Sequence, residues 1–291
     1  MDKLEETKQL LKKYKIKANK SLGQNFLIDG KVIEQILQGS EISENDLVIE
    51  IGPGLGTLTN ELRKKAKKVI AIELDPKMVT ILQERFSKEE NVEIIYQDVL
   101  KCNLQEILQR EKEKINYESA KVVANLPYYI TTPIIMKLLE EKLDLTSITV
   151  MIQKEVAERL TALPGTKNAG AITYSIYYYA KSREIGEVPK SCFIPEPEVT
   201  SEVIQLQIRH EPPVKTKEAK VMFAIIKSAF LQRRKTLVNA LVNSKVFINK
   251  EEALKQFERL KIPEKARAEE IPIEKYAQMA DLLLELVAQD K

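Results

Sequence analysis

The chain has 291 residues, of which 44% are hydrophobic, and its 46 Lys and Arg against 43 Asp and Glu give a net charge of +3. This length allows one large and one smaller domain, and the composition excludes a disordered chain, a membrane-spanning chain and a secretory signal, so we expect a cytosolic globular protein. Its two cysteines, Cys102 and Cys192, lie far apart, and with the single histidine, His210, they predict neither a metal site nor a histidine base.

The first predicted elements are a helix over residues 3–17, an ordered loop over 21–29 and a short helix over 31–37. A strand over 46–51 then runs directly into Gly52-Pro53-Gly54-Leu55-Gly56, and a helix is predicted over 58–66. The next strand, 68–73, ends in Glu73, about twenty residues after the first glycine. Strand, glycine turn, helix and acid are typical of a nucleotide-binding βαβ unit, in which the acid accepts hydrogen bonds from both ribose hydroxyls.

The glycine spacing favours S-adenosylmethionine over a dinucleotide such as NAD. A dinucleotide site uses G-x-G-x-x-G, whereas here Thr57 occupies the position expected for the third glycine. Glu50 directly precedes the turn, where a carboxylate would repel phosphates. S-adenosylmethionine carries an ammonium, a carboxylate and a sulfonium but no phosphate, so acids and backbone amides at this turn suit it better.

Later strands are also predicted to end in polar side chains. Residues 92–98 end in Asp98, which is placed to accept a hydrogen bond from an adenine amine, and the strand 121–124 runs into Asn125. A fifth strand covers 147–152. Because the carboxyl ends of parallel strands meet at one edge of a sheet, the three polar strand ends predict a lined cleft.

The stretch Asn125-Leu126-Pro127-Tyr128 has two interpretations. Pro127 cannot donate a ladder hydrogen bond, so the strand must stop there. A side-chain amide and a fixed backbone carbonyl, roofed by an aromatic ring, suit a planar base that bears an exocyclic amine. Alternatively, Asn125 caps the following helix and the tyrosines pack inward. The stretch alone does not decide between them.

Beyond the fifth strand we expect a helix over 154–162, a loop over 163–168 and, in 171–180, several tyrosines that belong mostly to the core, some facing the sheet. Residues 181–188 and 201–209 predict an antiparallel strand pair. Two prolines between these strands fix an extended loop that holds Phe193 either over the cleft or in the core as a hydrophobic plug.

A proline pair, Pro212-Pro213, marks a linker, which predicts a domain boundary between residues 1–211 and 212–291. The rest is predicted to be helical, over 218–232, 251–260 and 273–288, with a turn or a helix over 235–242.

Basic residues gather in two places, where they suit phosphate-backbone contacts, although a solvated helix face is the alternative interpretation of each. The two groups are Lys8, Lys12, Lys13, Lys15, Lys17 and Lys20 near the start, and Lys227, Arg233, Arg234 and Lys235 later.

Several motifs follow one another along nearly the whole chain: SLGQNFL (21–27), EIGPGLGTLT (50–59), IELD (72–75), QDVL (97–100), NLPYYITTPI (125–134), FIPEPEVTS (193–201) and FLQRRKTLVNAL (230–241). In this order they resemble the S-adenosylmethionine-dependent rRNA adenine dimethyltransferases, most of all the bacterial type that acts on 16S rRNA. The resemblance implies a Rossmann-like α/β sheet of the class I methyltransferase kind, followed by a small all-α domain.

The resemblance also implies roles for individual residues. The cofactor would be S-adenosyl-L-methionine, and the residues expected to contact it are Asn25, Leu27, Gly52, Gly54, Glu73, Asp98 and Asn125. The implied reaction dimethylates the N6 amines of two adjacent adenosines in the 3′-terminal hairpin loop of 16S rRNA, within the small ribosomal subunit or its precursor. We expect a monomer that uses no metal and docks on the particle through Arg233, Arg234 and Lys235.

In this mechanism the Asn125 side-chain oxygen and the Leu126 carbonyl, fixed by Pro127, accept hydrogen bonds from the N6 amine. Its nitrogen lone pair then faces the methyl group, so catalysis is mainly positioning. Tyr128 and Phe193 would stack on the extruded base.

Two alternatives stay open. One is the macrolide-resistance methylase of 23S rRNA, which carries out the same reaction on another RNA; the 230–241 stretch and the long helical tail favour the small-subunit enzyme. The other is a non-enzymatic RNA-binding assembly or transcription factor on a retired methylase fold, against which Glu73, Asp98 and the intact NLPY stretch speak.

Overall fold

The computed structural model describes residues 3–16 and 23–289, and its internal contacts divide the chain into two compact units. Unit 1 comprises Met1–Ala157 and Ser182–Ile208, and unit 2 comprises Glu158–Lys181 and Arg209–Lys291. Residues 158–181 therefore group with the C-terminal helices, whereas the sequence placed them with the sheet. That the chain folds as two domains with a boundary at 211/212 stays a prediction.

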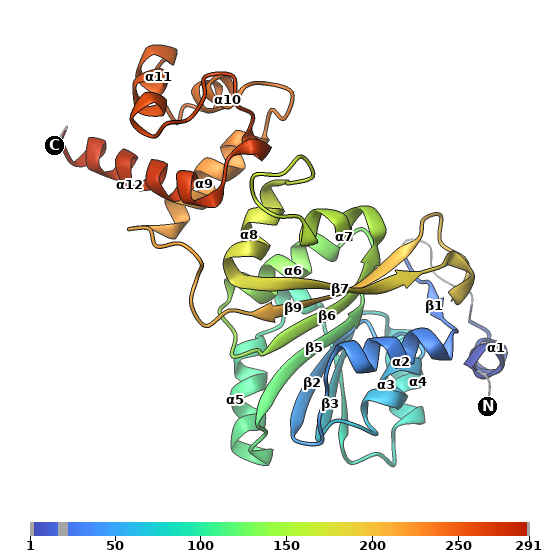
Figure 1. Ribbon diagram of the computed structural model, residues 1–291. Coiled ribbons are helices and arrows are strands. Elements are labelled where there is room, and N and C mark those ends of the chain that lie inside the picture. The colour runs from blue at the N-terminus through green and yellow to red at the C-terminus, as the bar shows by residue number, and fades with distance from the viewer. Residues whose placement is uncertain (1–2, 17–22, 290–291) are drawn as a thin grey trace. The chain divides into compact units, whose positions relative to one another are not determined.

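Unit 1 is built on a seven-stranded sheet with the strand order β4-β3-β2-β5-β6-β9-β7 (Figure 1). The first five of these strands are parallel, and β9 pairs antiparallel with β6. The chain passes outward from β2 to β3 and β4, then returns to β5 on the other side of β2, so a topological switch point lies between β2 and β5. The strands are β2 (Asp46–Ile51), β3 (Lys68–Glu73), β4 (Val92–Tyr96), β5 (Ser119–Asn125), β6 (Ser147–Gln153), β7 (Ala180–Val188) and β9 (Ser201–Ile208).

Helices cover both faces of this sheet (Figure 1), which is why every residue of β2 is buried although its sequence contains two acids. The helices of this part of the chain are α1 (Lys3–Lys13), α2 (Gly30–Gly39), α3 (Thr57–Leu62), α4 (Pro76–Arg85), α5 (Leu104–Ile115), α6 (Thr131–Glu140) and α7 (Lys154–Thr161), with short 3-10 turns η2 (Val99–Lys101) and η3 (Lys190–Cys192). None of the helices formed by residues 3–16 and 23–289 is long and apolar enough to span a membrane.

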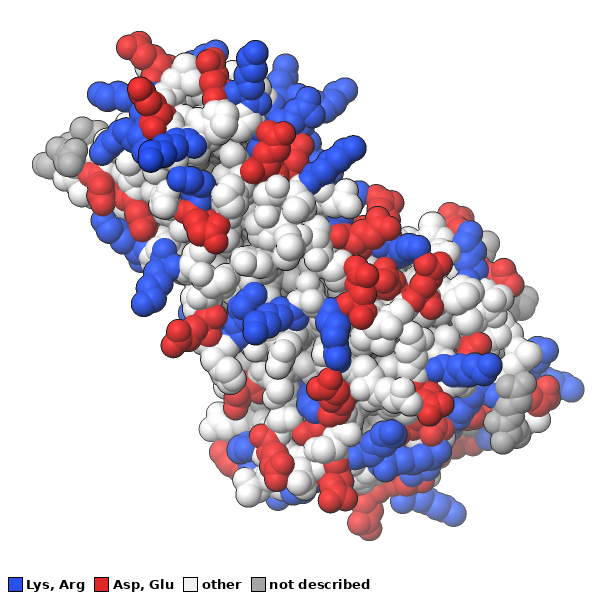
Figure 2. All heavy atoms as spheres, viewed as in Figure 1, with Lys and Arg blue, Asp and Glu red and all other residues white. Residues whose placement is uncertain are grey.

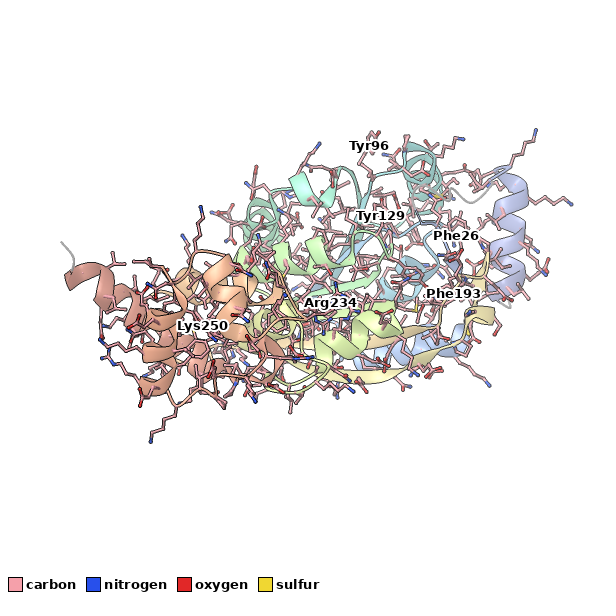
Figure 3. The ribbon with its side chains drawn as sticks, turned by 90° about the horizontal axis from the view of Figure 1, so that it is seen from above. Phe26, Tyr96, Tyr129, Phe193, Arg234 and Lys250 are labelled. Atoms are coloured by element: carbon pink, nitrogen blue, oxygen red, sulfur yellow. The ribbon has the colours of Figure 1, made fainter. Side chains whose placement is uncertain are left out.

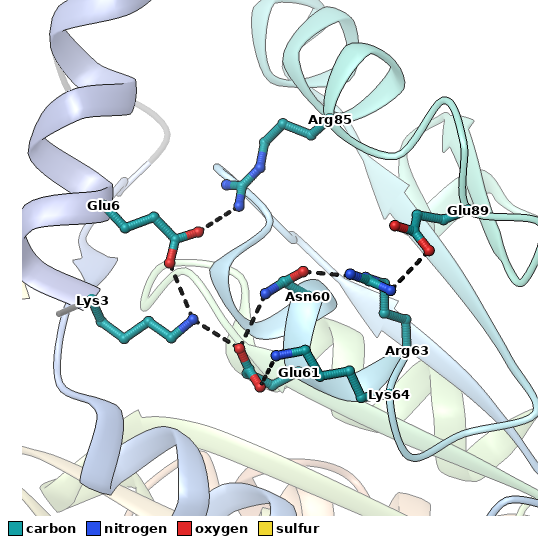
Figure 4. A network of polar contacts seen from close by, with 8 residues as sticks. All are labelled: Lys3, Glu6, Asn60, Glu61, Arg63, Lys64, Arg85 and Glu89. Carbon is teal, nitrogen blue, oxygen red and sulfur yellow. Dashed lines mark hydrogen bonds and ion pairs between the residues drawn. The ribbon is translucent and has the colours of Figure 1, made fainter. Parts of the chain in front are cut away.

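Helix α1 ends at Lys13, earlier than the predicted residue 17, and is held to unit 1 by a polar network (Figure 4). Lys3 binds Glu61 of α3 at 2.8 Å, and Glu6 binds Arg85 of α4 at 2.6 Å. Lys13, one of the lysines predicted to contact phosphate, is paired with Glu84 at 2.7 Å. The N-terminal residues Lys17, Lys20, Ser21 and Leu22, to which predictions were also attached, lie outside the described residues.

The predicted loop over 21–29 contains a short strand, β1 (Phe26–Leu27), which pairs antiparallel with β8 (Phe193–Ile194). Leu27 lies opposite Phe193, and the Ile28 amide donates to the Cys192 carbonyl at 2.9 Å. Two motifs from opposite ends of unit 1 are thus joined by backbone hydrogen bonds.

Unit 2 is helical and has its own core. Tyr174 is fully buried there, its ring 5.2 Å from that of Tyr276 and its hydroxyl donating to the Ile271 carbonyl at 2.6 Å. The expectation that most tyrosines of this segment belong to the core is confirmed for Tyr174, and the acceptors for its hydroxyl lie among the C-terminal helices. The helices are α8 (Ala171–Tyr179), α9 (Ala219–Phe230), α10 (Leu237–Asn243), α11 (Lys250–Arg259) and α12 (Ile273–Gln289), with the 3-10 turn η4 (Ala268–Glu270).

Candidate active site

A pocket lies in unit 1 at the carboxyl ends of β2, β3 and β5, beside the switch point of the sheet. The structure brings together at this pocket all the residues predicted to contact cofactor or to catalyse, namely Asn25, Leu27, Gly52, Gly54, Glu73, Asp98, Asn125, Leu126, Pro127 and Tyr128. Phe193 is not among the lining residues, and Arg233, Arg234 and Lys235 belong to unit 2. The role of each residue stays a prediction.

The glycine turn after β2 requires glycine because of its backbone conformation. Gly52 and Gly54 have φ angles of +68° and +57°, in the left-handed region that other residues avoid. The turn therefore presents bare backbone to the pocket, and the Gly54 amide donates to Glu73 Oε2 at 3.1 Å.

Glu73 is held by backbone amides on both of its oxygens. Besides the Gly54 bond to Oε2, its Oε1 accepts from the amides of Leu74 at 2.8 Å and Asp75 at 2.9 Å. Burial raises the pKa of Glu73, and these three N–H groups oppose that rise. A carboxylate fixed in this way has a defined direction and can still accept a bond on Oε2 from a ligand hydroxyl.

Asp98 follows β4 and is partly exposed at the pocket. Its Oδ1 accepts from the Leu100 amide at 3.0 Å and so caps η2. Among residues 3–16 and 23–289 we find no donor to its Oδ2. One oxygen is thus used to fix the side chain while the other stays available to a ligand amine.

Asn125 is the last residue of β5, and its Nδ2 donates to the Asn25 backbone carbonyl at 3.2 Å. This bond fixes the orientation of the carboxamide, and no described residue donates to its Oδ1. The N-terminus of α6 is capped by Ile130, with no side-chain cap bond. The interpretation of Asn125 as a helix cap is therefore wrong.

The turn after Asn125 leaves a second acceptor open. The Pro127 carbonyl accepts from the Ile130 amide at 3.2 Å and from the Thr131 hydroxyl at 3.1 Å, while the Leu126 amide donates to Met151 at 3.2 Å. Within the described residues nothing donates to the Leu126 carbonyl. Two unoccupied acceptors, one side-chain and one main-chain, thus follow each other at the pocket.

Tyr128 lines the pocket and is fixed at its far end, where its hydroxyl forms a 2.7 Å hydrogen bond with the Ser201 hydroxyl at the start of β9. Burial raises the pKa of Tyr128, so the phenol is neutral at physiological pH. No local pattern indicates this anchor, because Ser201 lies far from Tyr128 in the chain.

Phe193 is only 2% exposed and packs in the core with Leu27 and Val32, close to Phe26 in Figure 3. The hydrophobic plug, one of the two interpretations drawn from the sequence, describes its position here. Phe193 therefore supports the segment that carries Asn25, and its stacking on a base stays a prediction.

Among the pocket residues that were not predicted as site residues, Tyr129 and Glu50 have side chains suited to binding a ligand. Tyr129 is 59% exposed at the pocket rim, and only its place next to the NLPY stretch pointed to it. Glu50, which the sequence marked only as unfavourable for phosphate, is 2% exposed, lines the pocket, and has no hydrogen-bond partner for Oε2 among the described residues. Its isolation depends on packing that no local pattern reveals.

These residues fit S-adenosylmethionine. The buried Oε2 of Glu50 has no donor among the described residues, which suits a cationic ligand. The glycine turn presents bare backbone to the pocket. Glu73 and Asp98 each keep an acceptor oxygen for hydroxyl or amine groups. A seven-stranded, mostly parallel sheet with this pocket at its switch point defines a class I S-adenosylmethionine-dependent methyltransferase.

Comparison with known proteins narrows the class. The sequence pattern of the ribosomal RNA adenine dimethylase family matches residues 15–285, and this chain belongs to that family. It is 47% identical over 280 residues to the ribosomal RNA small subunit methyltransferase A of Alkaliphilus metalliredigens, covering 95% of this chain and 96% of the relative.

Two solved structures are similar to the fold. A dimethyladenosine transferase from Plasmodium falciparum is 25% identical with a TM-score of 0.71, covering 91% of this chain and 98% of that chain. The 23S rRNA methyltransferase ErmE has a TM-score of 0.66 at 23% identity, covering 89% of this chain and 99% of that chain, which shows the shared fold alone.

Proposed function

We propose that this enzyme transfers methyl groups from S-adenosylmethionine to the N6 amines of two adjacent adenosines in the 3′-terminal hairpin loop of 16S rRNA. Membership of the adenine dimethylase family supports the reaction, and relatives named for the small ribosomal subunit support the RNA. The observation that carries the proposal is the pair of unoccupied acceptors, Asn125 Oδ1 and the Leu126 carbonyl, beside the fixed ring of Tyr128.

The two acceptors answer the chemical difficulty of the reaction. An adenine N6 amine is a poor nucleophile because its lone pair is delocalised into the ring. Asn125 and Leu126 accept its two N–H bonds, which favours a tetrahedral nitrogen with its lone pair directed at the methyl group. Their contribution is alignment, for which intramolecular effective molarities are very large. S-adenosylmethionine, when bound, supplies an electrophilic methyl group.

No side-chain base is required in this scheme. The nitrogen becomes acidic only as its new bond forms, so the proton leaves late and passes to water. Tyr128, neutral and held by Ser201, offers its ring to the extruded base. Since the acceptors are main-chain and carboxamide groups, their state does not change with pH.

The cofactor is held by the remaining lining residues. Glu73 accepts from the ribose, Asp98 from the adenine amine, and the backbone of Gly52 and Gly54 borders the methionine end. Asn25 and Leu27 close the opposite wall, and the β1–β8 pairing keeps them there.

RNA docking is assigned to Arg233, Arg234 and Lys235, all exposed in unit 2. We propose that one chain suffices, because every residue of the pocket comes from unit 1 of a single chain. The transfer needs no metal, because a sulfonium methyl is already activated. Since the substrate is ribosomal RNA, the enzyme acts in the cytoplasm.

The deciding experiment maps N6,N6-dimethyladenosine in rRNA from cells with and without this protein. We expect two adjacent dimethylated adenosines near the 3′ end of 16S rRNA to be lost with the protein and restored by the wild-type gene. Restoration by an Asn125→Ala variant would contradict the catalytic assignment.

The second candidate substrate is 23S rRNA, favoured only by the fold shared with ErmE. Purified enzyme with labelled cofactor should methylate small-subunit particles and not large-subunit RNA. If only 23S rRNA became labelled, 23S rRNA would be the substrate and the proposed 16S rRNA would not.

A further inference from the structure

The mouth of the pocket concentrates the exposed apolar surface of unit 1. Apart from Val199, the large hydrophobic side chains that are exposed in the described part of unit 1 are Leu74, Tyr96, Leu100 and Tyr129. Leu74 and Tyr129 line the pocket, and the other two each lie two residues from Asp98, which also lines it. Exposed apolar side chains that gather at one place indicate a binding site, whereas single ones scattered over a surface do not.

Tyr129 differs from the other three in what lies next to it. They lie beside Glu73 or Asp98, on the side to which the cofactor is assigned above. Tyr129 directly follows the NLPY stretch, to which the target base is assigned. The cofactor therefore leaves the exposure of Tyr129 unexplained, and the ligand on this side of the pocket is the RNA.

Tyr128 and Tyr129 are the two central residues of one turn, which the Ile130 amide closes by donating to the Pro127 carbonyl at 3.2 Å. Their side chains are held differently. The Tyr128 hydroxyl is bound to Ser201 at 2.7 Å, whereas Tyr129 is 59% exposed and its hydroxyl has no hydrogen bond to any described residue. One turn thus carries an anchored ring in the pocket and a second ring at the rim.

One edge of the Tyr129 ring adjoins the wall of the pocket. A Cβ atom on Gly23 would lie 3.5 Å from Cδ1 and 3.7 Å from Cε1 of this ring, so the glycine main chain lies beside that edge. The Gly23 carbonyl accepts from Asn25 Nδ2 at 3.3 Å, and the Asn25 carbonyl accepts from Asn125 at 3.2 Å. The ring therefore has a defined place next to the catalytic turn, although most of it is open to solvent.

We propose that Tyr129 is a second base-binding platform, on which the nucleotide next to the extruded adenosine stacks while that adenosine lies in the pocket against Tyr128. The inference rests on the proposed function and adds a subsite for its RNA substrate. Extrusion takes a stacking partner away from the neighbouring base, which then has a bare face. An exposed ring one residue beyond Tyr128 covers that face at the rim of the pocket.

Stacking suits a substrate in which two adjacent adenosines are both methylated. A ring contacts the flat face of a base, and every base has such a face. In one of the two rounds the neighbour is the other adenosine of the pair, which the ring holds with or without methyl groups on N6. A site that accepted hydrogen bonds from that N6 amine would lose its donors once the amine was dimethylated.

Loss of the platform should affect transfer more than docking. Tyr129 stabilises the extruded arrangement, so Tyr129→Ala should slow single-turnover transfer at saturating particles by about 5- to 150-fold, the range for one lost base–aromatic stack. Affinity for the particle should change little, because docking is assigned to the cations of unit 2. Tyr129→Phe should match wild type, since the hydroxyl has no described partner, and Tyr129→Leu should match Tyr129→Ala, since leucine offers no ring.

The test removes the proposed partner from the RNA. Small-subunit particles are completed with a synthetic 3′ end of 16S rRNA in which either the first or the second adenosine of the pair is an abasic residue. Single-turnover transfer to the remaining adenosine is compared with transfer to the same adenosine of intact particles. On one of the two abasic particles the ratio of the wild-type rate to the Tyr129→Ala rate should fall to about one, because the base that Tyr129 holds is missing.

Tyr96→Ala is the matched control, since Tyr96 is 61% exposed and lies at the end of β4. Its rate relative to wild type should be the same on all three particles. Calorimetry with S-adenosylhomocysteine should give the wild-type affinity for Tyr129→Ala, which shows that the variant is folded and its cofactor site intact.

A ratio between wild type and Tyr129→Ala that stayed the same on all three particles would overturn the inference and leave the proposed function standing. Weaker binding of S-adenosylhomocysteine to Tyr129→Ala would also overturn it, because the ring would then belong to the cofactor site. If the wild-type protein left intact particles unmethylated, the proposed function would be wrong and the inference would fail with it.

Discussion

The pocket of unit 1 and the basic turn of unit 2, defined as residues 231–236, hold their polar groups in opposite ways. In the pocket, Glu73 is fixed by three backbone amides and Asn125 by the Asn25 carbonyl. In the basic turn, Arg233, Arg234 and Lys235 are exposed, and we find no ion pair to them among the described residues. Several basic side chains project together from the face of unit 2 visible in Figure 2.

The difference separates geometry from charge. A polar group that the backbone holds in place works through the direction of its hydrogen bond. Its loss should abolish one function, either cofactor binding or methyl transfer, and a similar charge elsewhere cannot replace it. A free cation acts by its charge, so its loss should be graded and sensitive to salt. The predictions below test this division, beginning with the largest effect.

Asn125→Ala should lower the rate of methyl transfer by about 10²-fold or more, with little change in RNA or cofactor affinity. Asn125 ends a strand paired on both sides, so its backbone should stay in place. Alanine removes an acceptor that is needed most in the transition state. Single-turnover transfer at saturating RNA measures the effect.

The matched control is Asn103→Ala. Asn103 caps α5 through a 3.2 Å bond to the Glu106 amide, so its loss should cost about 1 kcal/mol of stability and leave the transfer rate unchanged. A folded Asn125→Ala protein with a near wild-type rate would remove the NLPY stretch from the mechanism.

Glu73→Ala should weaken cofactor binding by about 1–3 kcal/mol, which is roughly 5- to 150-fold, and leave RNA affinity largely intact. The change removes an acceptor and also frees the Gly54 amide that holds the glycine turn. Calorimetry with S-adenosylhomocysteine measures it. Unchanged affinity in a folded variant would show that the ribose binds elsewhere.

Replacing Arg233, Arg234 and Lys235 together by Gln should weaken binding to small-subunit particles and reduce the salt slope of that binding by about 2. Cofactor affinity and the transfer rate on saturating RNA should not change. Binding curves at two salt concentrations provide the measurement.

The control for this charge change is Lys217→Gln with Lys250→Gln, also in unit 2, because both lysines are already paired, with Glu285 at 2.8 Å and Glu264 at 2.9 Å. Arg234 and Lys250 are labelled in Figure 3. An equal loss in the control would mean that total charge, and not the basic turn, governs docking.

The features that the sequence predicted best are the buried parallel strands. The predicted bounds of β2 and β3, 46–51 and 68–73, agree with the structure, because buried parallel strands read as short apolar runs between turn residues. Helix α3 is shorter than predicted, 57–62 instead of 58–66, because the chain turns after Leu62 to enter β3. The polar strand ends were also predicted to meet, and they do.

What the sequence missed depends on contacts between distant segments. The β1–β8 pairing, the Tyr128–Ser201 bond and the Asn125–Asn25 bond each join residues far apart in the chain. Such contacts have no periodic signal. The two interpretations of Phe193 and of Asn125 differed only in these contacts, which is why the residues alone left both open.

The smallest expected effect is on the free energy of unfolding. It follows from replacing an ion-paired residue of unit 1, in the network that holds α1 (Figure 4). Glu61 binds Lys3 at 2.8 Å and Lys64 at 2.7 Å. Although burial opposes it, these contacts lower the pKa of Glu61 to about 2. We expect Glu61→Gln to cost about 0.5–1 kcal/mol of unfolding free energy at pH 7, a value reduced by solvent screening.

The pH dependence identifies the source of this loss. A carboxylate whose pKa is lower in the folded state than its ordinary value of 4.5 stabilises the fold above that value, and the contribution disappears as pH falls toward about 2. Urea unfolding should therefore separate wild type from Glu61→Gln at pH 7 and at pH 5, and the gap should shrink below pH 4.5 and close as pH falls toward about 2. Added salt should also narrow the gap, without the change in RNA affinity expected for the basic turn. A gap that stayed undiminished from pH 5 to pH 2 would mean that Glu61 stabilises the fold through packing and not through its charge.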